Sequence, residues 1–342
     1  MQTENKISIK AAASQKKKIN LSRREYATVV IILLVFIFAA VLKPELFTGA
    51  RLGEMVTSIL LWMPLIVTVA MGMLLVICLG DIDISVGSII GFVGMSVGFL
   101  FRDYNIPIPV AFLIAAGMGL ACGALNGFLI SYINIPSMIV TLATLNIFRG
   151  FAMIVGDSYQ IMSDQIPAEL GAFVTHGFLG IPWLSWMAIF LVIIMIFVMR
   201  YTHFGREVYA VGGNREAARL RGINVKKVRM VVFMLVGMFA GIAAVMYGAR
   251  YGMYHALTTG QSFEFVVISA TVIGGASMNG GTGSVVGTLL GSLLLGSIQT
   301  LIPMCGLSGY YYQAIYGLII IIALIIDRVI ESRQVAAAVA EV

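Results

Sequence analysis

Charged residues are scarce in this chain. Only 11% of its 342 residues are Asp, Glu, Lys or Arg, whereas 60% are apolar. An ordinary soluble domain carries about 25% charged and about 45–50% apolar residues. A soluble chain needs polar side chains over its surface. The composition therefore excludes an ordinary soluble domain and predicts an all-α membrane protein with several spanning helices.

Residues suited to covalent and metal chemistry are also few. The three cysteines lie apart in apolar segments, and the three histidines have no metal-ligand spacing. We therefore interpret Cys78, Cys122 and Cys305 as core residues and predict no catalytic, metal-binding or cofactor-binding residues on this chain. The sequence has no phosphate-binding loop of the form G-x-x-x-x-G-K-[ST]. Any energy-driven process of this chain would then depend on a separate subunit or on an ion gradient.

Long apolar stretches recur along the chain. A spanning helix needs about 20 mostly apolar residues. Ten stretches fit: 26–42, 55–79, 84–101, 108–132, 137–155, 183–199, 229–249, 264–279, 283–302 and 310–326. The first could be a signal peptide, but it lacks a small-residue cleavage site, so we expect a retained anchor. The sequence thus predicts one domain of ten transmembrane helices over residues 26–326.

Basic residues are concentrated on one side of these spans. Seventeen of the 22 Lys and Arg residues lie in segments 1–25, 200–228 and 327–342 or at the adjoining helix ends. Because basic loops favour the cytoplasm, we expect both terminal tails, loop 200–228 and the tight connections 80–83, 133–136 and 280–282 to be cytoplasmic. The longest loop on the other side, 156–182, is then outside and can meet an extracellular partner. Nucleic-acid binding is excluded, because each basic cluster adjoins an apolar span.

Two tight connections are rich in Gly and Asp and precede similar helices. Residues 80–83 read Gly-Asp-Ile-Asp and come before Val-Gly-Ser-Ile-Ile-Gly at 86–91. Residues 279–283 read Asn-Gly-Gly-Thr-Gly and come before Val-Gly-Thr-Leu-Leu-Gly at 286–291. Glycine-interrupted segments that recur in two halves indicate an internally duplicated transporter core. The alternative is chance, because glycine-rich helices often repeat such short patterns.

Loop 200–228 contains a short predicted helix. Asn214 is placed to cap its first turn, the helix should run to Arg221, and Gly222 should end it. Glu216 and Arg219 can pair on its surface. A short amphipathic helix on the basic side is suited to docking a cytosolic protein. The alternative is a basic loop that only sets the topology.

Segment 201–228 closely resembles the coupling segment of the permease subunits of bacterial ATP-binding-cassette (ABC) importers for simple sugars. The family includes permeases for ribose, xylose, arabinose, galactosides and autoinducer 2, and the likeness is best to the ribose branch. Three further stretches match in order and spacing. They are Gly-Asp-Ile-Asp-Ile-Ser-Val-Gly-Ser at 80–88, Val-Ile-Gly-Gly-Ala-Ser at 272–277 with Gly280-Gly281, and Tyr-Tyr-Gln at 311–313 leading to Asp327.

The resemblance implies a ten-helix, type II ABC importer-like permease in a bacterial inner membrane. It implies a dimer with a second copy or a homologous permease, and an extracytoplasmic sugar-binding protein. A cytosolic ABC ATPase, with two fused nucleotide domains, would hold the ATP and Mg. The implied substrate is a monosaccharide, ribose or a related pentose or sugar-like molecule. The implied ATPase-coupling residues are Gly212, Gly213, Asn214, Arg215, Glu216, Ala217, Ala218, Arg219 and Gly222.

The chain departs from the family pattern at two places. Thr282 stands where the family often has a basic residue after the paired glycines. Residues 265–271 are more apolar than the corresponding stretch of ribose permeases. Either difference is consistent with another substrate or with a non-identical partner permease.

Several polar residues lie within the predicted spans. Asp83 is placed to cap a helix that begins at Ile84, with Ser85 in its first turn, and substrate contact is the alternative. Asn126, Thr144 and Asn146 are suited either to joining helices or to lining a sugar path. Glu264 is expected at the outer face, as a first-turn charge or a contact for the binding protein. Arg149 is expected to extend towards the outer interface.

Two other functions fit the sequence less well. An ion-coupled secondary transporter would need ionisable residues deep in the bundle, whereas most carboxylates here lie near predicted helix ends. An intramembrane protease is suggested formally by Gly-Leu-Ser-Gly at 306–309. No histidine follows Ser308, however, and a serine nucleophile needs a base within reach. We therefore expect residues 306–309 to form a turn between two spans.

Overall fold

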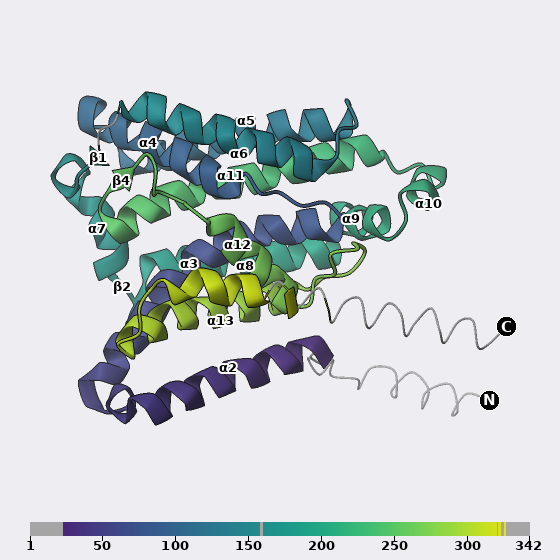
Figure 1. Cartoon of the computed structure of the whole chain (residues 1–342). Coiled ribbons are helices and arrows are strands. Elements are labelled where there is room, and N and C mark those ends of the chain that lie inside the picture. The colour runs from purple at the N-terminus through teal and green to yellow at the C-terminus, as the bar shows by residue number, and fades with distance from the viewer. Residues whose placement is uncertain (1–22, 158–159, 320, 323–324, 326–342) are drawn as a thin grey trace, which may run out of the picture.

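A computed structural model describes residues 23–157, 160–319, 321–322 and 325 of the chain. This part is almost wholly helical (Figure 1). Within it, eight helices are long and apolar enough to cross a membrane. They are α2 (Arg23–Leu42), α3 (Gly49–Cys78), α4 (Val86–Tyr104), α5 (Ile108–Ser131), α6 (Ser137–Gly156), α8 (Trp183–Tyr201), α11 (Val225–Tyr251) and α13 (Val285–Met304).

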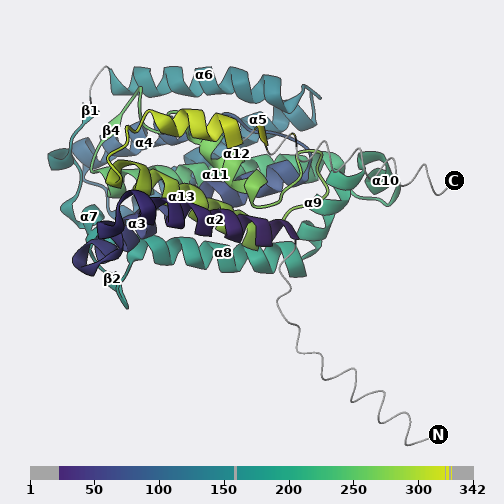
Figure 2. The same ribbon diagram turned by 60° about the horizontal axis from the view of Figure 1, so that its bottom comes forward.

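Shorter elements join these helices at the two ends of the bundle. One end, here called the α10 end, carries α9 (His203–Gly213) and α10 (Arg215–Leu220). The opposite, α7 end carries α7 (Ala168–Thr175) and four two-residue strands. There β1 (Gln160–Ile161) pairs antiparallel with β4 (Tyr254–His255), and β2 (Gly177–Phe178) pairs with β3 (Ile181–Pro182). Figure 2 shows the same separation of the two ends from a second direction. Two short 3₁₀ helices are η1 (Pro44–Phe47) and η2 (Ser163–Gln165).

The eight long helices match eight of the ten predicted spans with small shifts at their ends. For the last predicted span, 310–326, the described residues 311–319, 321–322 and 325 are helical. The rest of that span and most of both predicted tails, 1–25 and 327–342, lie outside the described residues. The long apolar runs alone predicted the positions of these eight helices, because each helix presents apolar side chains over most of its surface.

The predicted span 264–279 is wrong in its length. Helix α12 (Phe263–Ile273) has only 11 residues, which is about 16 Å at 1.5 Å per residue and roughly half of a bilayer core. The helix ends because Gly275 has a φ of 95°, a left-handed conformation that favours glycine. The chain then continues to Ser284 without helix.

Glycines of the two similar segments pack against both ends of α12. Gly87 of α4 packs against Glu264 in the first turn of α12 and against Gly260 just before it, where a Cβ would overlap both. Gly287 and Gly291 of α13 pack against the backbone at the other end of α12. Gly87 and Gly287 therefore have matching places beside the short helix, because small residues allow close approach, whereas Gly91 packs against Arg149 and Thr259 instead.

Candidate functional site

The short helix in the basic loop forms as predicted. Asn214 Oδ1 accepts a hydrogen bond from the Ala217 amide at 2.9 Å, so Asn214 is the N-cap of α10. At the other end Gly222 has a φ of 83° and ends the turn. Of the six helical residues only Ala218 is buried, and Leu220 is 87% exposed. No ion pair joins the two predicted surface partners, Glu216 and Arg219, in the described part of the chain.

Asp81 connects α10 to the bundle. Its carboxylate accepts two hydrogen bonds from Arg229, Nε to Oδ2 at 2.8 Å and Nη2 to Oδ1 at 2.8 Å. Arg215 of α10 lies 3.2 Å from the same Oδ2 and donates to the Leu79 carbonyl at 3.1 Å. Asp81 is buried, and a bidentate Arg–carboxylate pair has a well-defined geometry. Helices α10 and α11 therefore share one fixed carboxylate.

Backbone contacts between glycines form a second connection at the α10 end. A Cβ on Gly212, just before α10, would overlap the Cys78 carbonyl at the end of α3. The Gly281 amide donates to this carbonyl at 2.8 Å. A Cβ on Gly280 would lie 2.8 Å from both the Gly212 oxygen and the Gly80 nitrogen. The loop after α12, the end of α3 and the segment before α10 thus meet without side chains between them.

Tyr209 of α9 adds a side chain to this junction. Its hydroxyl donates a hydrogen bond to the Gly283 carbonyl at 2.8 Å. Burial raises the pKa of the Tyr209 phenol well above its ordinary value, because the charged phenolate is poorly solvated there. The phenol stays protonated at physiological pH and remains a donor to the loop before α13.

Three of the predicted path residues lie together in the interior. Asp83 Oδ1 accepts hydrogen bonds from the Ser85 amide at 2.8 Å and the Ser85 hydroxyl at 2.6 Å. Asn126 Nδ2 donates to the same hydroxyl at 2.8 Å. Asp83 Oδ2 and Asn126 Oδ1 have no hydrogen-bond partner among the described residues. These three side chains form a polar contact between α5 and the segment that leads into α4.

The prediction that Asp83 caps a helix beginning at Ile84 is wrong. Helix α4 begins at Val86, with Ser85 at its N-cap position. The bonds from Asp83 to Ser85 form a local turn, which offers the backbone an alternative to helix and delays the helix start. Asp83 is fully buried beside this turn instead of in the helix.

The other two predicted path residues are placed differently. Thr144 of α6 is buried, and its hydroxyl donates to the Thr141 carbonyl within the same helix at 3.4 Å. Asn146 is exposed on α6 and donates to the Leu142 carbonyl at 3.0 Å. The structure therefore does not bring Asn146 together with Asp83, Ser85 and Asn126.

Glu264 and Arg149 lie inside the bundle rather than at its outer surface. Glu264 is only 7% exposed and its carboxylate lies against Gly87, near the start of α4. Glu264 is in the first turn of α12, as predicted. Its expected exposure at the outer face is wrong, because the chain enters the bundle as a loop before α12 begins. The Arg149 guanidinium donates to the carbonyls of Ala256 and Thr259 at 3.0 and 2.8 Å. It therefore holds this loop instead of extending outward.

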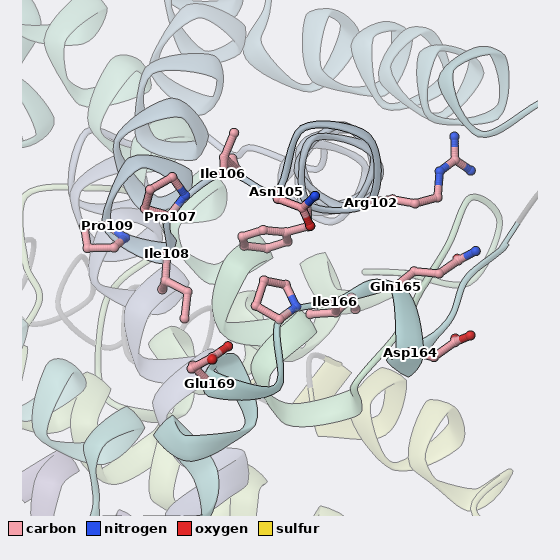
Figure 3. Close-up of a pocket in the computed structure, with 12 residues that line it drawn as sticks. Arg102, Asn105, Ile106, Pro107, Ile108, Pro109, Asp164, Gln165, Ile166 and Glu169 are labelled. Atoms are coloured by element: carbon pink, nitrogen blue, oxygen red, sulfur yellow. The ribbon is translucent and has the colours of Figure 1, made fainter.

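The α7 end has a cavity beside the predicted outer loop. Figure 3 shows side chains from the end of α4 and the α4–α5 connection facing those of residues 164–169. The cavity has a volume of about 710 Å³. Arg102, Asp164 and Glu169 give it charges of both signs, among prolines and isoleucines. Glu264, the predicted contact for a binding protein, does not line it.

The Gly-Leu-Ser-Gly sequence at 306–309, which resembles a protease motif, forms a turn, as predicted. Ser308 lies between α13 and the helical residues that begin at Tyr311. Its hydroxyl accepts a hydrogen bond from the Tyr310 amide at 3.3 Å. This geometry is that of a helix connection.

The structure is that of a membrane transport subunit. It has a bundle of apolar helices, a capped and exposed helix at one end and a cavity at the other. A family model described as "Branched-chain amino acid transport system / permease component" matches residues 55–324, and the chain belongs to this family of permeases. It is a multi-pass membrane component of an ABC transporter and not an enzyme. An ABC transporter also includes an ATPase and, in an import system, a binding protein.

Three curated proteins illustrate the relationship. The chain is 34% identical to the L-arabinose ABC transporter permease protein AraH of Azospirillum brasilense, over 88% of this chain and 86% of that one. It is 30% identical to the autoinducer 2 import system permease protein LsrC of Escherichia coli O157:H7, over 90% and 87%. It is 33% identical to the probable ABC transporter permease protein YphD of Escherichia coli K12, over 78% and 79%.

Sequence reasoning missed two residues at the α10 end. Asp81 was placed in a turn without a partner, and Arg229 was counted only as a topology signal. A signal was present, since a buried carboxylate needs a cation and the basic cluster predicted on the same side of the membrane includes Arg215 and Arg229. The sequence separation of 148 residues between Asp81 and Arg229 concealed which cation it was.

Proposed function

We propose that this chain is the permease subunit of an ABC importer that passes a monosaccharide into the cytoplasm by ATP-driven alternating access. The observation that carries the proposal is helix α10. It is capped, exposed and joined to the bundle through Asp81, in a chain that belongs to an ABC permease family. A helix that is attached to the bundle on one face and exposed on the other can be moved by a partner protein that binds the exposed face.

The partner at the α10 end is a cytosolic ABC ATPase, with two fused nucleotide domains that hold ATP and Mg. The proposed contact is segment 212–222, namely Gly212, Gly213, Asn214, Arg215, Glu216, Ala217, Ala218, Arg219 and Gly222. Movement of α10 would reach α11 through Arg215, Asp81 and Arg229. It would reach α3 and the loop before α13 through Gly212 and Gly281.

The partner at the α7 end is an extracytoplasmic sugar-binding protein. The cavity of about 710 Å³ and the long connection 156–182 lie at this end, opposite α10. Charges of both signs on Arg102, Asp164 and Glu169 can fix the orientation of a docked protein.

The proposed substrate is ribose or a related pentose or sugar-like molecule. Two relatives are named for L-arabinose transport and autoinducer 2 import. The buried hydroxyl and amide of Ser85 and Asn126 can exchange weak hydrogen bonds with a sugar, and Asp83 Oδ2 is without a partner among the described residues. Thr144 and Asn146 remain predictions for the path.

The proposed assembly is a pair of permeases in a bacterial inner membrane. Each would have ten transmembrane segments in a type II importer-like arrangement, counting α12 with the loop that follows it. Both termini would be cytoplasmic, on the side of α10. This sidedness is supported by the basic residues of segments 1–25, 200–228 and 327–342.

Co-purification tests the partners. The tagged chain would be isolated in mild detergent, and the proteins that accompany it identified by mass spectrometry. We expect an ATPase with fused nucleotide domains. A single permease sequence would then indicate a homodimer, and a second one a mixed pair.

Uptake tests the energy source and substrate. Cells that express the whole system would be given labelled ribose, arabinose or xylose, with ATP depletion or an ionophore as matched treatments. We expect uptake of at least one pentose to fail on ATP depletion and to survive the ionophore. Recovery of the chain without an ATPase, with uptake abolished by the ionophore instead, would contradict the proposal.

A further inference from the structure

A second cavity opens between five separate parts of the chain. It lies between the middle of α3, the last turns of α11, residues 258–266, α13 and residues 309–316. None of the predicted path residues lines it, and it shares no lining residue with the cavity in Figure 3. Because its walls come from five sequence-distant segments, nothing in the linear sequence indicates this cavity.

Aromatic rings make up much of its wall. Tyr247 and Tyr251 of α11 lie with ring centroids 4.2 Å apart, and Trp62 of α3 meets Tyr251 edge-on at 5.6 Å. Tyr312 and Tyr316 stack on the opposite side at 6.4 Å. Aromatic faces offer flat apolar surfaces, while the tyrosine hydroxyls provide polar contacts at their edges. This combination suits a ring that has apolar faces and hydroxyls around its rim.

Amide groups stand between these rings. Gln261, Gln299 and Gln313 all line the cavity, and the Gln299 backbone carbonyl accepts a hydrogen bond from the Tyr312 hydroxyl at 2.7 Å. An amide side chain can both donate and accept hydrogen bonds. Sugar hydroxyls need both kinds of partner.

Two buried polar groups of the wall lie close to each other. Gln299 is 8% exposed and Tyr316 is 4% exposed. The Tyr316 hydroxyl is near enough to the Gln299 side chain for a weak hydrogen bond, but neither Gln299 Oε1 nor the Tyr316 hydroxyl makes a well-formed hydrogen bond with a described residue. A buried polar group without a partner costs about 1–3 kcal/mol, so such groups usually bind a ligand or water.

The cavity also limits the charge and size of what it can hold. None of its lining residues is Asp, Glu, Lys, Arg or His. Arg250, which is outside the lining, lies over the rings of Trp62 and Tyr251 at 5.6 and 6.0 Å. The volume is about 220 Å³, equal to about seven waters at ~30 Å³ each. This is room for one neutral sugar ring.

We propose that this cavity is a transient binding site for one neutral monosaccharide within the membrane part of the permease. The sugar ring stacks on the aromatic wall, and its hydroxyls bond to the Gln299 amide and the Tyr316 hydroxyl. This inference rests on the proposed transport function and adds a specific site to it. The site holds its ligand weakly, because each contact replaces a bond to water, and weak binding allows onward transfer.

Trp62 makes the site directly testable. The chain has three tryptophans, Trp62, Trp183 and Trp186, so W183F combined with W186F leaves Trp62 as the single indole fluorophore. The purified full chain in lipid nanodiscs would be titrated with D-ribose, L-arabinose, D-xylose and leucine. We expect a saturable change in Trp62 emission with at least one pentose, at millimolar concentration, and none with leucine.

Matched variants separate binding from loss of structure. Tyr316→Phe keeps the ring and removes only the hydroxyl, and Gln299→Leu keeps the side-chain length. We expect both to weaken the pentose response, Gln299→Leu by tenfold or more. Ser292→Ala, which removes a buried hydroxyl of α13 outside this cavity, should leave the response unchanged. No response to any of the sugars, or a response to leucine alone, would overturn the inference.

Uptake by cells carrying the same variants distinguishes the two proposals. If ATP-dependent pentose uptake persists while Trp62 never responds, the site is wrong and the transport function stands. If Trp62 responds in the purified chain but no ATPase co-purifies and no sugar is taken up, the site stands and the proposed function is wrong.

Discussion

Arg215 and Arg229 reach the same buried carboxylate from two different helices. Arg229 binds Asp81 through two hydrogen bonds at 2.8 Å, whereas Arg215 is 3.2 Å away and 43% exposed. The two arginines therefore have different roles. Arg229 neutralises Asp81 inside the protein, and Arg215 attaches α10 to the same carboxylate.

Removing the charge of Asp81 should destabilise the protein. In Asp81→Asn the Arg229 guanidinium loses its buried counter-charge, and breaking such a pair costs about 3–5 kcal/mol. We expect a clearly lower unfolding temperature in detergent, measured by fluorescence-detected size exclusion. Asp103→Asn is the control, because Asp103 pairs with Arg102 near the protein surface at 2.7 Å. Equal unfolding temperatures for wild type and Asp81→Asn would contradict the structural role.

Arg215→Gln should leave the stability of the protein nearly unchanged and reduce its transport activity. The pair of Arg229 with Asp81 remains, so we expect an unfolding temperature close to that of the wild type. Pentose uptake should fall several-fold, because α10 is no longer held to Asp81. Normal uptake would show that this ion pair is not part of the coupling.

Leu220 is an apolar side chain at the bare end of α10, 87% exposed. In Leu220→Glu a charge would be buried in the contact with the ATPase. We expect co-purification of the ATPase to fall at least tenfold, about 1.4 kcal/mol, without a change in membrane insertion. Leu179→Glu, equally accessible at the other end of the molecule, is the matched control. Undiminished ATPase recovery with Leu220→Glu would place the contact elsewhere.

At the scale of elements, α10 and α12 show where sequence reasoning works and where it fails. Helix α10 was predicted correctly because its N-cap and its terminal glycine are local signals, contained within a few residues. Helix α12 was predicted too long because the apolar run continues past its end. Gly274 and Gly275 can lie inside a spanning helix or end it, and hydropathy does not distinguish these cases.

The close approach of α12 to α13 can be tested with one substitution. A side chain at Gly291 would overlap the Ala270 carbonyl of α12, whereas Gly150 of α6 has open space around its Cα. We expect Gly291→Val to cost about 1–3 kcal/mol through overpacking, and Gly150→Val to cost far less. Unfolding temperatures of both variants provide the measurement. Equal losses would indicate a general effect of valine in these helices rather than a specific contact.

At the scale of the whole molecule, segments predicted to share one side of the membrane do meet at one end of the bundle. Gly280 packs against the backbones of both Gly80 and Gly212. Residues 160–161, from the longest predicted outer loop, pair with 254–255 at the other end. The grouping of these segments at two opposite ends agrees with the charge pattern. The assignment of the α10 end to the cytoplasm stays a prediction.

Labelling with a membrane-impermeant thiol reagent tests that sidedness. Starting from a chain in which Cys78, Cys122 and Cys305 are replaced by alanine, single cysteines would be introduced as Leu220→Cys and Leu179→Cys. Both positions are strongly exposed, at opposite ends. We expect Leu179→Cys to react in intact cells and Leu220→Cys only after the membrane is opened. The reverse pattern would invert the proposed topology.

The sequence by itself determined the class of protein, the position of most of its long helices and the short capped helix α10. Each depends on features read within a short window, namely apolar length, basic charge, a cap and a glycine. The tertiary structure alone decided the partner of Asp81, the depth of Glu264, the halved α12 and the aromatic cavity. The ion pair of Asp81, the burial of Glu264, the short length of α12 and the walls of the aromatic cavity all depend on contacts between residues far apart in the chain. Hydropathy and residue spacing carry no information about such contacts.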